Sequence, residues 1–419
     1  MQSKSKIFFW TLFDFANTSF SVIIVTVIYS KYFTNYVAGG KTWLWGLAVS
    51  ISMVISALLS PPMGAIADLS RSRKRFLLLF TLVCVVCTAL MFYVRKGDVL
   101  LGLILFIFAD IGFESGLVFY DAFLPNLTGK KNFGRVSGYG FAMGYIGALT
   151  VLLIAMVILP ASTAPNYYFF VRLTFVVASV FFLSFSLPLF FFVKEPQIIS
   201  PVKKSAVRIG MKNSRETLKA LFIKGQYPAI SRFLLAFFLY NDAIITIIAF
   251  ASIFASSILK MTDAQVIYFF IITQSTAVSG AFIFGIVSDH IGPKKTITIT
   301  LIIWLAVAVG AFFVQTVSEF YLVGLSAGLA IGSSQSCSRS LMALLTPRSR
   351  EAEFFGFYDG LFGKSSAVAG PLFYGIIADL FNQRFAALAM GLFFLSGLII
   401  LQKVEVPKYK DQNELPAEA

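Results

Sequence analysis

Two stretches of the chain carry the same pattern, Gly64-Ala-Ile-Ala-Asp68-Leu-Ser-Arg71-Ser-Arg73-Lys74-Arg75 and Gly285-Ile-Val-Ser-Asp289-His-Ile-Gly292-Pro-Lys294-Lys295. In each, a glycine near the end of a long apolar run is followed by an aspartate and then by basic residues. The two aspartates lie 221 residues apart in a chain of 419 residues. This spacing indicates that one half of the chain repeats the other.

The composition is that of a membrane protein. Hydrophobic residues make up 58% of the chain and charged residues 13%, whereas a soluble domain carries about 25% charged residues. Apolar runs of about 20 residues recur, and each is long enough to cross a hydrocarbon core of about 30 Å. A backbone within lipid must satisfy its own hydrogen bonds, which favours helices. We therefore predict an all-α polytopic membrane protein.

The apolar runs predict twelve transmembrane helices in two pseudo-symmetric bundles of six. The predicted spans are approximately 8–35, 43–68, 76–94, 99–124, 136–160, 167–193, 229–258, 264–289, 296–315, 319–345, 353–379 and 384–402. Residues 1–193 would form the N-terminal bundle and residues 229–403 the C-terminal bundle. Residues 194–228 would form a basic cytoplasmic linker, and residues 404–419 a cytoplasmic tail.

The positive charge follows this topology. The formal net charge is +14, and the segments predicted to lie inside hold 24 of the 34 Lys and Arg residues, against 6 in the outer loops. Because cytoplasmic loops are enriched in Lys and Arg, both termini are expected in the cytoplasm. The basic balance thus reflects topology and lipid contact, and no nucleic-acid partner is expected. Within the linker, residues 208–222 suit either an amphipathic helix on the inner leaflet or a plain solvated connection.

Further landmarks repeat between the halves and point to a superfamily. Leu124-Pro125 is echoed by Thr346-Pro347, and the glycine-rich segment 138–147 has a counterpart at 356–370. Two parallel six-helix halves around a central cavity are the arrangement expected of a major facilitator transporter. The paired glycine–aspartate–basic loops resemble the signature of that superfamily. We expect Gly64, Asp68 and Arg71, with Gly285 and Asp289, to latch the inner gate in one state and release it in the other.

Several charged and polar residues lie at membrane depth, where a charge costs about 3 kcal/mol or more and usually serves a function. Asp110, Glu114 and Asp121 share one face of the fourth predicted span, and Asp14 and Asn17 share a face of the first. Desolvation favours the neutral form of a carboxyl group, so such a residue could exchange a proton near neutral pH.

We assign these residues to two roles. Those expected to bind substrate or a coupling proton are Asp14, Asn17, Asp110, Glu114, Asn241, Asp242 and Gln335. Those expected to have a structural or gating role, besides the two latches, are Asp121, Arg135, Arg339, Asp359 and Lys364. Arg135 is expected to pair with Asp121 or with the latch after the second span. The alternative is that the intramembrane charges form neutralising pairs with no part in transport.

Three motifs resemble one branch of the major facilitators. They are Trp10-Thr-Leu-Phe-Asp14-Phe-Ala-Asn17-Thr-Ser-Phe20, Phe119-Tyr-Asp121-Ala-Phe-Leu124-Pro125 and Arg135-Val-Ser-Gly138-Tyr-Gly-Phe-Ala-Met-Gly144-Tyr145. They are similar to motifs of the autophagy-related vacuolar amino-acid effluxer-like branch, and they lie in the N-terminal half. The resemblance implies the major facilitator fold and a transport function. Its fungal members export amino acids from the vacuole, whereas the short loops here indicate a prokaryotic member in the plasma membrane.

The resulting hypothesis is a secondary transporter that moves a small polar solute, for example an amino acid, by alternating access with proton coupling. The expected partners are the solute, a coupling proton or cation and membrane lipids, and the chain is expected to act as a monomer. The only histidine, His290, is expected in a loop, so we expect no metal, no cofactor and no enzymatic activity. The alternatives are a sugar:cation symporter, a lipid scramblase and a non-transporting sensor.

Overall fold

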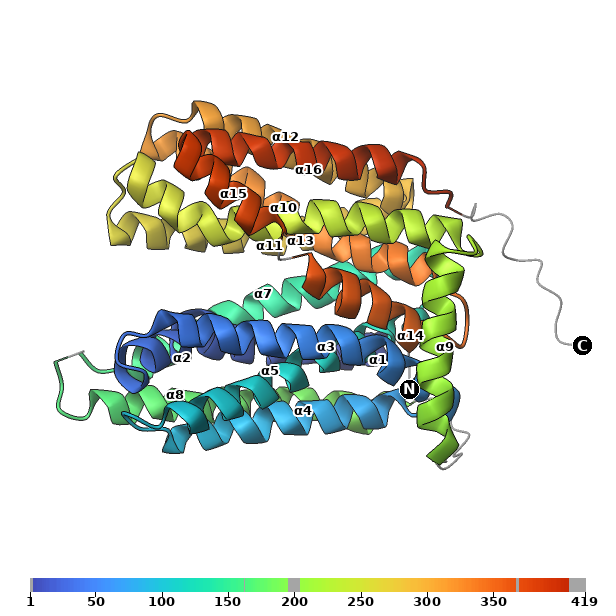
Figure 1. Ribbon diagram of the computed structural model, residues 1–419, viewed down its shortest axis with the longest axis horizontal. Coiled ribbons are helices and arrows are strands. Elements are labelled where there is room, and N and C mark those ends of the chain that lie inside the picture. Colours follow the sequence, from blue (N-terminus) through green and yellow to red (C-terminus); the bar gives the residue numbers. More distant parts are fainter. Residues whose placement is uncertain (1–2, 162, 195–203, 367–368, 407–419) are drawn as a thin grey trace, which may run out of the picture. The chain divides into compact units, whose positions relative to one another are not determined.

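The computed structural model describes residues 3–161, 163–194, 204–366 and 369–406, and every regular element among them is a helix (Figure 1). The all-helical prediction is therefore confirmed for this part of the chain. Part of the predicted linker, residues 195–203, and most of the predicted tail, residues 407–419, lie outside the described residues.

The first half of the chain forms a series of long helices. They are α1 (Ser3–Phe20), continued by η1 (Ser21–Val27), α2 (Tyr29–Lys31) and η2 (Tyr32–Val37), then α3 (Thr42–Ser70), α4 (Arg73–Leu90), η3 (Met91–Tyr93), α5 (Val99–Asp121), α6 (Leu124–Leu127), η4 (Lys130–Asn132), α7 (Phe133–Ile158) and α8 (Tyr167–Phe192). The elements η1 and η2 are π-helical stretches, so the first predicted span is one continuous but irregular helix over Lys4–Val37.

The second half begins with a helix in the linker region. It contains α9 (Lys204–Phe222), α10 (Pro228–Ile258), α11 (Asp263–Ile291), α12 (Pro293–Phe313), α13 (Val317–Leu345), α14 (Glu351–Phe355), η5 (Gly356–Gly363), α15 (Ala369–Leu380) and α16 (Gln383–Gln402). The element η5 is π-helical and contains Gly356, Gly360 and Gly363 of the eleventh predicted span.

Ten helices among the described residues are long and apolar enough to cross a membrane. Two of the twelve predicted spans are not among them. One corresponds to α13, which is 29 residues long and rich in serine. The other is divided into α14, η5 and α15. The multi-pass membrane character is thus confirmed, while the count of twelve rests on these two atypical segments.

By contacts, the chain divides into two compact units. Unit 1 comprises residues 1–123, 139–214 and 349–365, and unit 2 comprises residues 124–138, 215–348 and 366–419. Each unit therefore includes a segment from the opposite half of the sequence. The predicted bundle boundaries, 1–193 and 229–403, remain a prediction.

In unit 1, long helices pack side by side along their lengths (Figure 1). Helix α5 packs against both α3 and α4, and α1 packs against α8. The elements α14 and η5, from the C-terminal half of the sequence, pack against α3. The packing core includes fully buried aromatic residues such as Trp10, Phe106 and Phe119.

Small residues bring α3 and the segment α14–η5 into close contact, as is common between membrane helices. A Cβ atom at Gly64 would lie 2.2 Å from the carbonyl oxygen of Ala352, and one at Gly360 would lie 2.2 Å from Cβ of Ser60. Neither position has room for a larger residue. The glycines of both regions therefore allow the two backbones to touch.

In unit 2, α11 packs against α13, and α16 packs against both α10 and α12. The N-terminal residues of α7 belong to this unit, where they meet the C-terminal part of α11. A Cβ atom at Gly138 would lie 2.3 Å from the carbonyl oxygen of Ala281, so this contact also depends on glycine.

The linker helix α9 is an amphipathic helix, as one of the two interpretations predicts. One face is buried, with Leu221 at 2% exposure, while Met211 and Phe222 remain exposed. Gly210 lies against Ile66 of unit 1. Contact of the exposed face with lipid remains a prediction.

Candidate substrate and proton site

The first latch holds the N-terminus of α14 within unit 1. The carboxylate of Asp68 accepts hydrogen bonds from the backbone N–H groups of Ala352 (3.1 Å) and Glu353 (2.9 Å). Its Oδ1 atom also accepts the Nε–H of Arg73 at 2.7 Å, and Arg73 pairs in turn with Glu351. Backbone N–H groups at a helix N-terminus lack partners within the helix and favour negative charge. Asp68 thus provides the acceptor for a helix that lies 284 residues away in the sequence.

The second latch has the same design within unit 2. The Oδ1 atom of Asp289 accepts the N–H groups of Gly134 (2.8 Å) and Arg135 (3.3 Å), at the start of α7. Its Oδ2 atom accepts the Nε–H of Arg135 at 2.6 Å. A Cβ atom at Gly285 would lie 2.8 Å from the carbonyl oxygen of Gly134. Each repeated aspartate therefore binds a helix start and an arginine.

These contacts identify the cations that bind the two repeated aspartates. The cation that binds Asp68 is Arg73, whereas Arg71 is exposed and ends α3 in the left-handed conformation with φ of 46°. The acidic partner found for Arg135 is Asp289 of the second latch, and its predicted pairing with Asp121 remains a prediction. The sequence pattern contained the basic cluster, but it did not show which member of the cluster faces the aspartate.

The intramembrane acids of α5 divide into two environments. The carboxylate of Glu114 forms an ion pair with the ammonium of Lys364, which also lies 3.4 Å from Oδ2 of Asp359. Lys364 follows directly after η5, so this cluster joins the two halves of the sequence within unit 1. We call Glu114, Asp359 and Lys364 the ion cluster; it holds two carboxylates and one ammonium group.

Asp110 lies one helical turn before Glu114 and is 1% exposed. Its Oδ2 atom lies 2.5 Å from the hydroxyl oxygen of Ser52 on α3. Among the described residues, Asp110 forms no ion pair, and its Oδ1 atom has no hydrogen-bond donor. Asp110 and Glu114 therefore have different partners, although they share a face of α5.

Asp14 lies in a third group, between α1 and the end of α5. Its Oδ2 atom accepts the hydroxyl of Tyr120 at 2.8 Å, and Asn17 donates to Oδ1 at 3.4 Å. The Tyr120 ring stacks between Trp10 and Phe13, with ring centroids at 4.6 and 4.8 Å. Because Tyr120 is six residues beyond Glu114, Asp14 contacts α5 about 9 Å along the helix from Glu114.

In unit 2, the predicted polar residues of α10 contact the start of α15 and Ser366, which precedes it. Asp242 is fully buried, and its Oδ2 atom accepts the N–H of Gly370 at 2.7 Å, in the first turn of α15. The side-chain amide of Asn241 donates to Ser366 at 2.7 Å. Asp242 therefore interacts with a helix N-terminus, as Asp68 and Asp289 do.

The remaining predicted residues are buried or half-buried in their helices. The guanidinium of Arg339, on α13, donates to the hydroxyl of Ser137 at 2.9 Å and to its carbonyl oxygen at 2.8 Å. Asp121 is buried at the end of α5, and Gln335 is half-buried on α13. The substrate and gating roles of all these residues remain predictions.

Three residues of these groups were not assigned from the sequence. They are Ser52, Arg73 and Glu351. A signal existed for Arg73, which lies in the repeated motif. For Ser52 no signal existed, since a single serine in a long apolar helix is ordinary.

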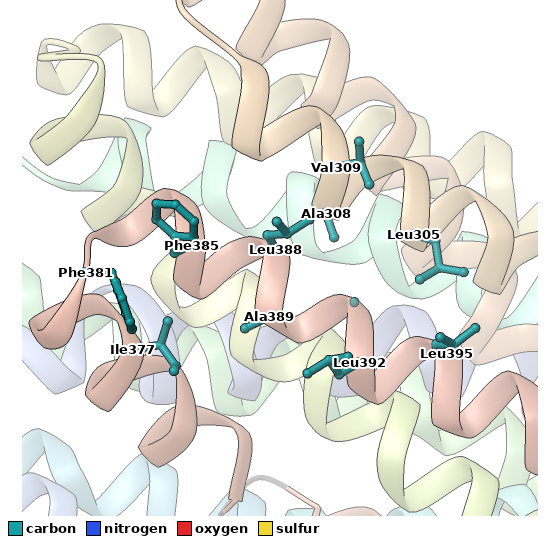
Figure 2. A pocket seen from close by; sticks show the side chains of 11 residues that line it. Leu305, Ala308, Val309, Ile377, Phe381, Phe385, Leu388, Ala389, Leu392 and Leu395 are labelled. Carbon is teal, nitrogen blue, oxygen red and sulfur yellow. The ribbon is translucent and has the colours of Figure 1, made fainter.

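A separate hollow in unit 2 is lined only by apolar side chains of α12, α15, α16 and the turn between the last two, including Leu305, Phe381 and Leu392 (Figure 2). It contains no group that could orient a polar solute. The groups that could do so are the ones described above.

The sequence profile of the family described as vacuole effluxer Atg22 like matches residues 45–414. The chain belongs to this family. The uncharacterized MFS-type transporter YxiO of Bacillus subtilis is 29% identical to this Atg22-like chain over 97% of both chains. Autophagy-related protein 22 of Kluyveromyces lactis is 26% identical, covering 86% of this chain and 79% of its own.

Solved structures confirm the major facilitator fold of this Atg22-like chain. FucP, a major facilitator transporter in the outward conformation, matches with a TM-score of 0.75 at 14% identity, over 97% of this chain and 99% of its own. The human organic anion transporter MFSD10 matches with a TM-score of 0.73 at 16% identity, over 96% and 100% of the two chains. The resemblance predicted from the sequence is therefore confirmed, and the protein is a multi-pass secondary transporter.

Proposed function

We propose that this transporter moves a small polar solute with an ammonium group, such as an amino acid, across the plasma membrane by alternating access with proton coupling. The observation that supports the proposal is the ion cluster, in which Glu114 and Asp359 hold the ammonium of Lys364. An ammonium group of a solute has the same charge and the same donors as the Lys364 side chain. It could therefore replace Lys364 at one of the two carboxylates.

The cluster also supports a gating role for Lys364. Lys364 belongs to the second half of the sequence and Glu114 to the first. In alternating access, one repeat moves against the other around a fixed site. A solute that takes the carboxylate from Lys364 would release one of the contacts that join the two repeats.

The test begins with ligand identification, because the substrate must be found before transport is measured. The purified protein is screened by thermal unfolding against amino acids, peptides and sugars at several pH values. A ligand that binds only the folded protein raises the melting temperature, by RT ln(1 + [L]/Kd) in free energy. We expect amines to raise it and neutral sugars to leave it unchanged.

The uptake of the ligand identified in this screen is then measured in proteoliposomes with and without an imposed pH gradient. We expect Glu114→Gln to abolish uptake and the matched variant Glu405→Gln to retain it, because the Glu405 side chain is 89% exposed. Unchanged uptake by Glu114→Gln would overturn the assignment. Uptake of a sugar with sodium would favour a sugar:cation symporter, and translocation of a lipid probe without any solute exchange would favour a scramblase.

A further inference from the structure

The hydroxyl of Ser52 makes two contacts but has one hydrogen. Its oxygen lies 2.9 Å from the carbonyl oxygen of Val49 and 2.5 Å from Oδ2 of Asp110. A carbonyl oxygen and an ionised carboxylate can only accept hydrogen bonds. Both contacts are hydrogen bonds when Oδ2 of Asp110 carries a proton and donates it to Ser52, while Ser52 donates to Val49.

The surroundings of Asp110 also favour its neutral form. An ionised carboxylate offers about four acceptor positions, and a buried one requires several donors or a cation. Among the described residues, Asp110 meets one hydroxyl, and its second oxygen meets no donor. A neutral carboxylic acid needs much less compensation, because burial disfavours only the charged form.

The charged, titratable and polar groups around Asp110 come from four segments. On α5 itself, Glu114 lies one turn away and adds negative charge. From the end of η5, Lys364 contributes positive charge, but its ammonium is paired with Glu114 and Asp359. From α4, the thiol of Cys84 is fully buried. From α3, Asp110 meets the hydroxyl of Ser52. Among the described residues, none of these groups forms an ion pair with Asp110, and Lys364 is shared by two other carboxylates.

We infer that Asp110 is held protonated by Ser52 and is the residue that exchanges the coupling proton. The first part rests on geometry alone, and the second rests on the proposed function. When the O–H bond of Asp110 breaks and its proton leaves, three carboxylates share the single ammonium of Lys364. The site then gains affinity for a cationic group, so that a proton and the ammonium of a solute compete for it.

The protonation of Asp110 is tested on the full-length protein in lipid, without any solute, by infrared difference spectroscopy over a pH titration. We expect a C=O stretching band of a protonated carboxylic acid that is absent from Asp110→Asn. Ser52→Ala should move this band to higher frequency, because it removes the hydrogen-bond acceptor. Glu405→Gln should leave the band as in the wild type. A wild-type spectrum without the band, or a band unaffected by both Asp110→Asn and Ser52→Ala, would overturn the inference.

The coupling role is tested with the solute found by the screen. We expect Asp110→Asn to lose accumulation driven by a pH gradient and to bind the solute with an affinity that no longer changes with pH. Thermal unfolding of the variant checks that it is folded. If Asp110→Asn still accumulates the solute in response to a pH gradient, the coupling role of Asp110 is overturned. If instead the wild type shows the acid band but no solute is driven by pH, proton coupling in the proposed function fails, while the protonated state of Asp110 stands.

Discussion

Glu114 and Lys364 place opposite charges in an interior shielded from water, with 10% and 12% of their side chains exposed. Transferring two charges out of water costs free energy that their attraction only partly returns. The Glu114–Lys364 ion pair therefore contributes little to the stability of the fold. Its importance is that each charged group can exchange its partner for another charged group. Asp359 shares Lys364, so the cluster retains a negative charge when the lysine is present.

Removing one partner of this pair leaves a buried charge without compensation. We expect Lys364→Gln to destabilise the protein by about 3–5 kcal/mol, the range measured for broken buried pairs. The double variant Lys364→Gln with Glu114→Gln should recover part of this loss, because it also removes the carboxylate. Thermal unfolding in detergent measures both. Equal melting temperatures for the double and the single lysine variant would show that the two charges do not interact.

At the level of elements, three aspartates stabilise the start of a helix from another part of the chain. Asp68 binds α14, Asp289 binds α7 and Asp242 binds α15. In each case the carboxylate meets backbone N–H groups that lack partners within the helix. At the two repeated motifs, a glycine one turn before the aspartate lets the backbones approach. The repeated glycine–aspartate motif therefore binds the N-terminus of a helix from another part of the chain.

The close approach at Gly64 has a direct consequence for stability. We expect Gly64→Ala to destabilise the protein by about 1–3 kcal/mol, the usual range for overpacking, because its Cβ atom would lie 2.2 Å from the carbonyl oxygen of Ala352. Gly46→Ala, on the same helix, has nothing within 4 Å of the new Cβ atom. This control should be neutral or stabilising, since alanine favours helix by about 1 kcal/mol over glycine. Thermal unfolding compares them, and equal effects of the two variants would contradict the docking role.

At the level of the whole molecule, the orientation in the membrane follows from the distribution of basic residues. The excess of Lys and Arg on one side predicts that the loop containing Arg71 is cytoplasmic and the loop containing Lys96 is external. Both residues are exposed and both can be replaced without disturbing a buried contact.

Labelling of single cysteines in whole cells tests on which side of the membrane each loop lies. The three native cysteines, Cys84, Cys87 and Cys337, are first replaced by alanine. We expect a membrane-impermeant thiol reagent to label Lys96→Cys in intact cells and Arg71→Cys only after the cells are opened. The reverse pattern would place the termini outside and would also remove the inner-gate role of the latches.

The helical class, the repeat and the family could be predicted from the sequence. Long apolar runs impose helices because lipid offers the backbone no partners. The two glycine–aspartate–basic motifs appear in the chain as a repeated string, and both are helix-docking sites. The two segments that depart from the predicted spans, α13 and the segment α14–η5–α15, carry the serines and glycines that lower hydropathy or break the regular helix.

The pairing of the side chains could not be predicted, for a physical reason. Helical periodicity indicates which residues share a face of their own helix, as it does for Asp110 and Glu114. It does not give the position along the helix axis at which the side chains of a neighbouring helix lie. That position is set by how two helices pack, and it separates Asp110, beside Ser52, from Glu114, beside Lys364. The sequence thus defined a membrane transporter with acids at membrane depth, and helix packing alone determined which acid is paired with a cation and which meets only a hydroxyl.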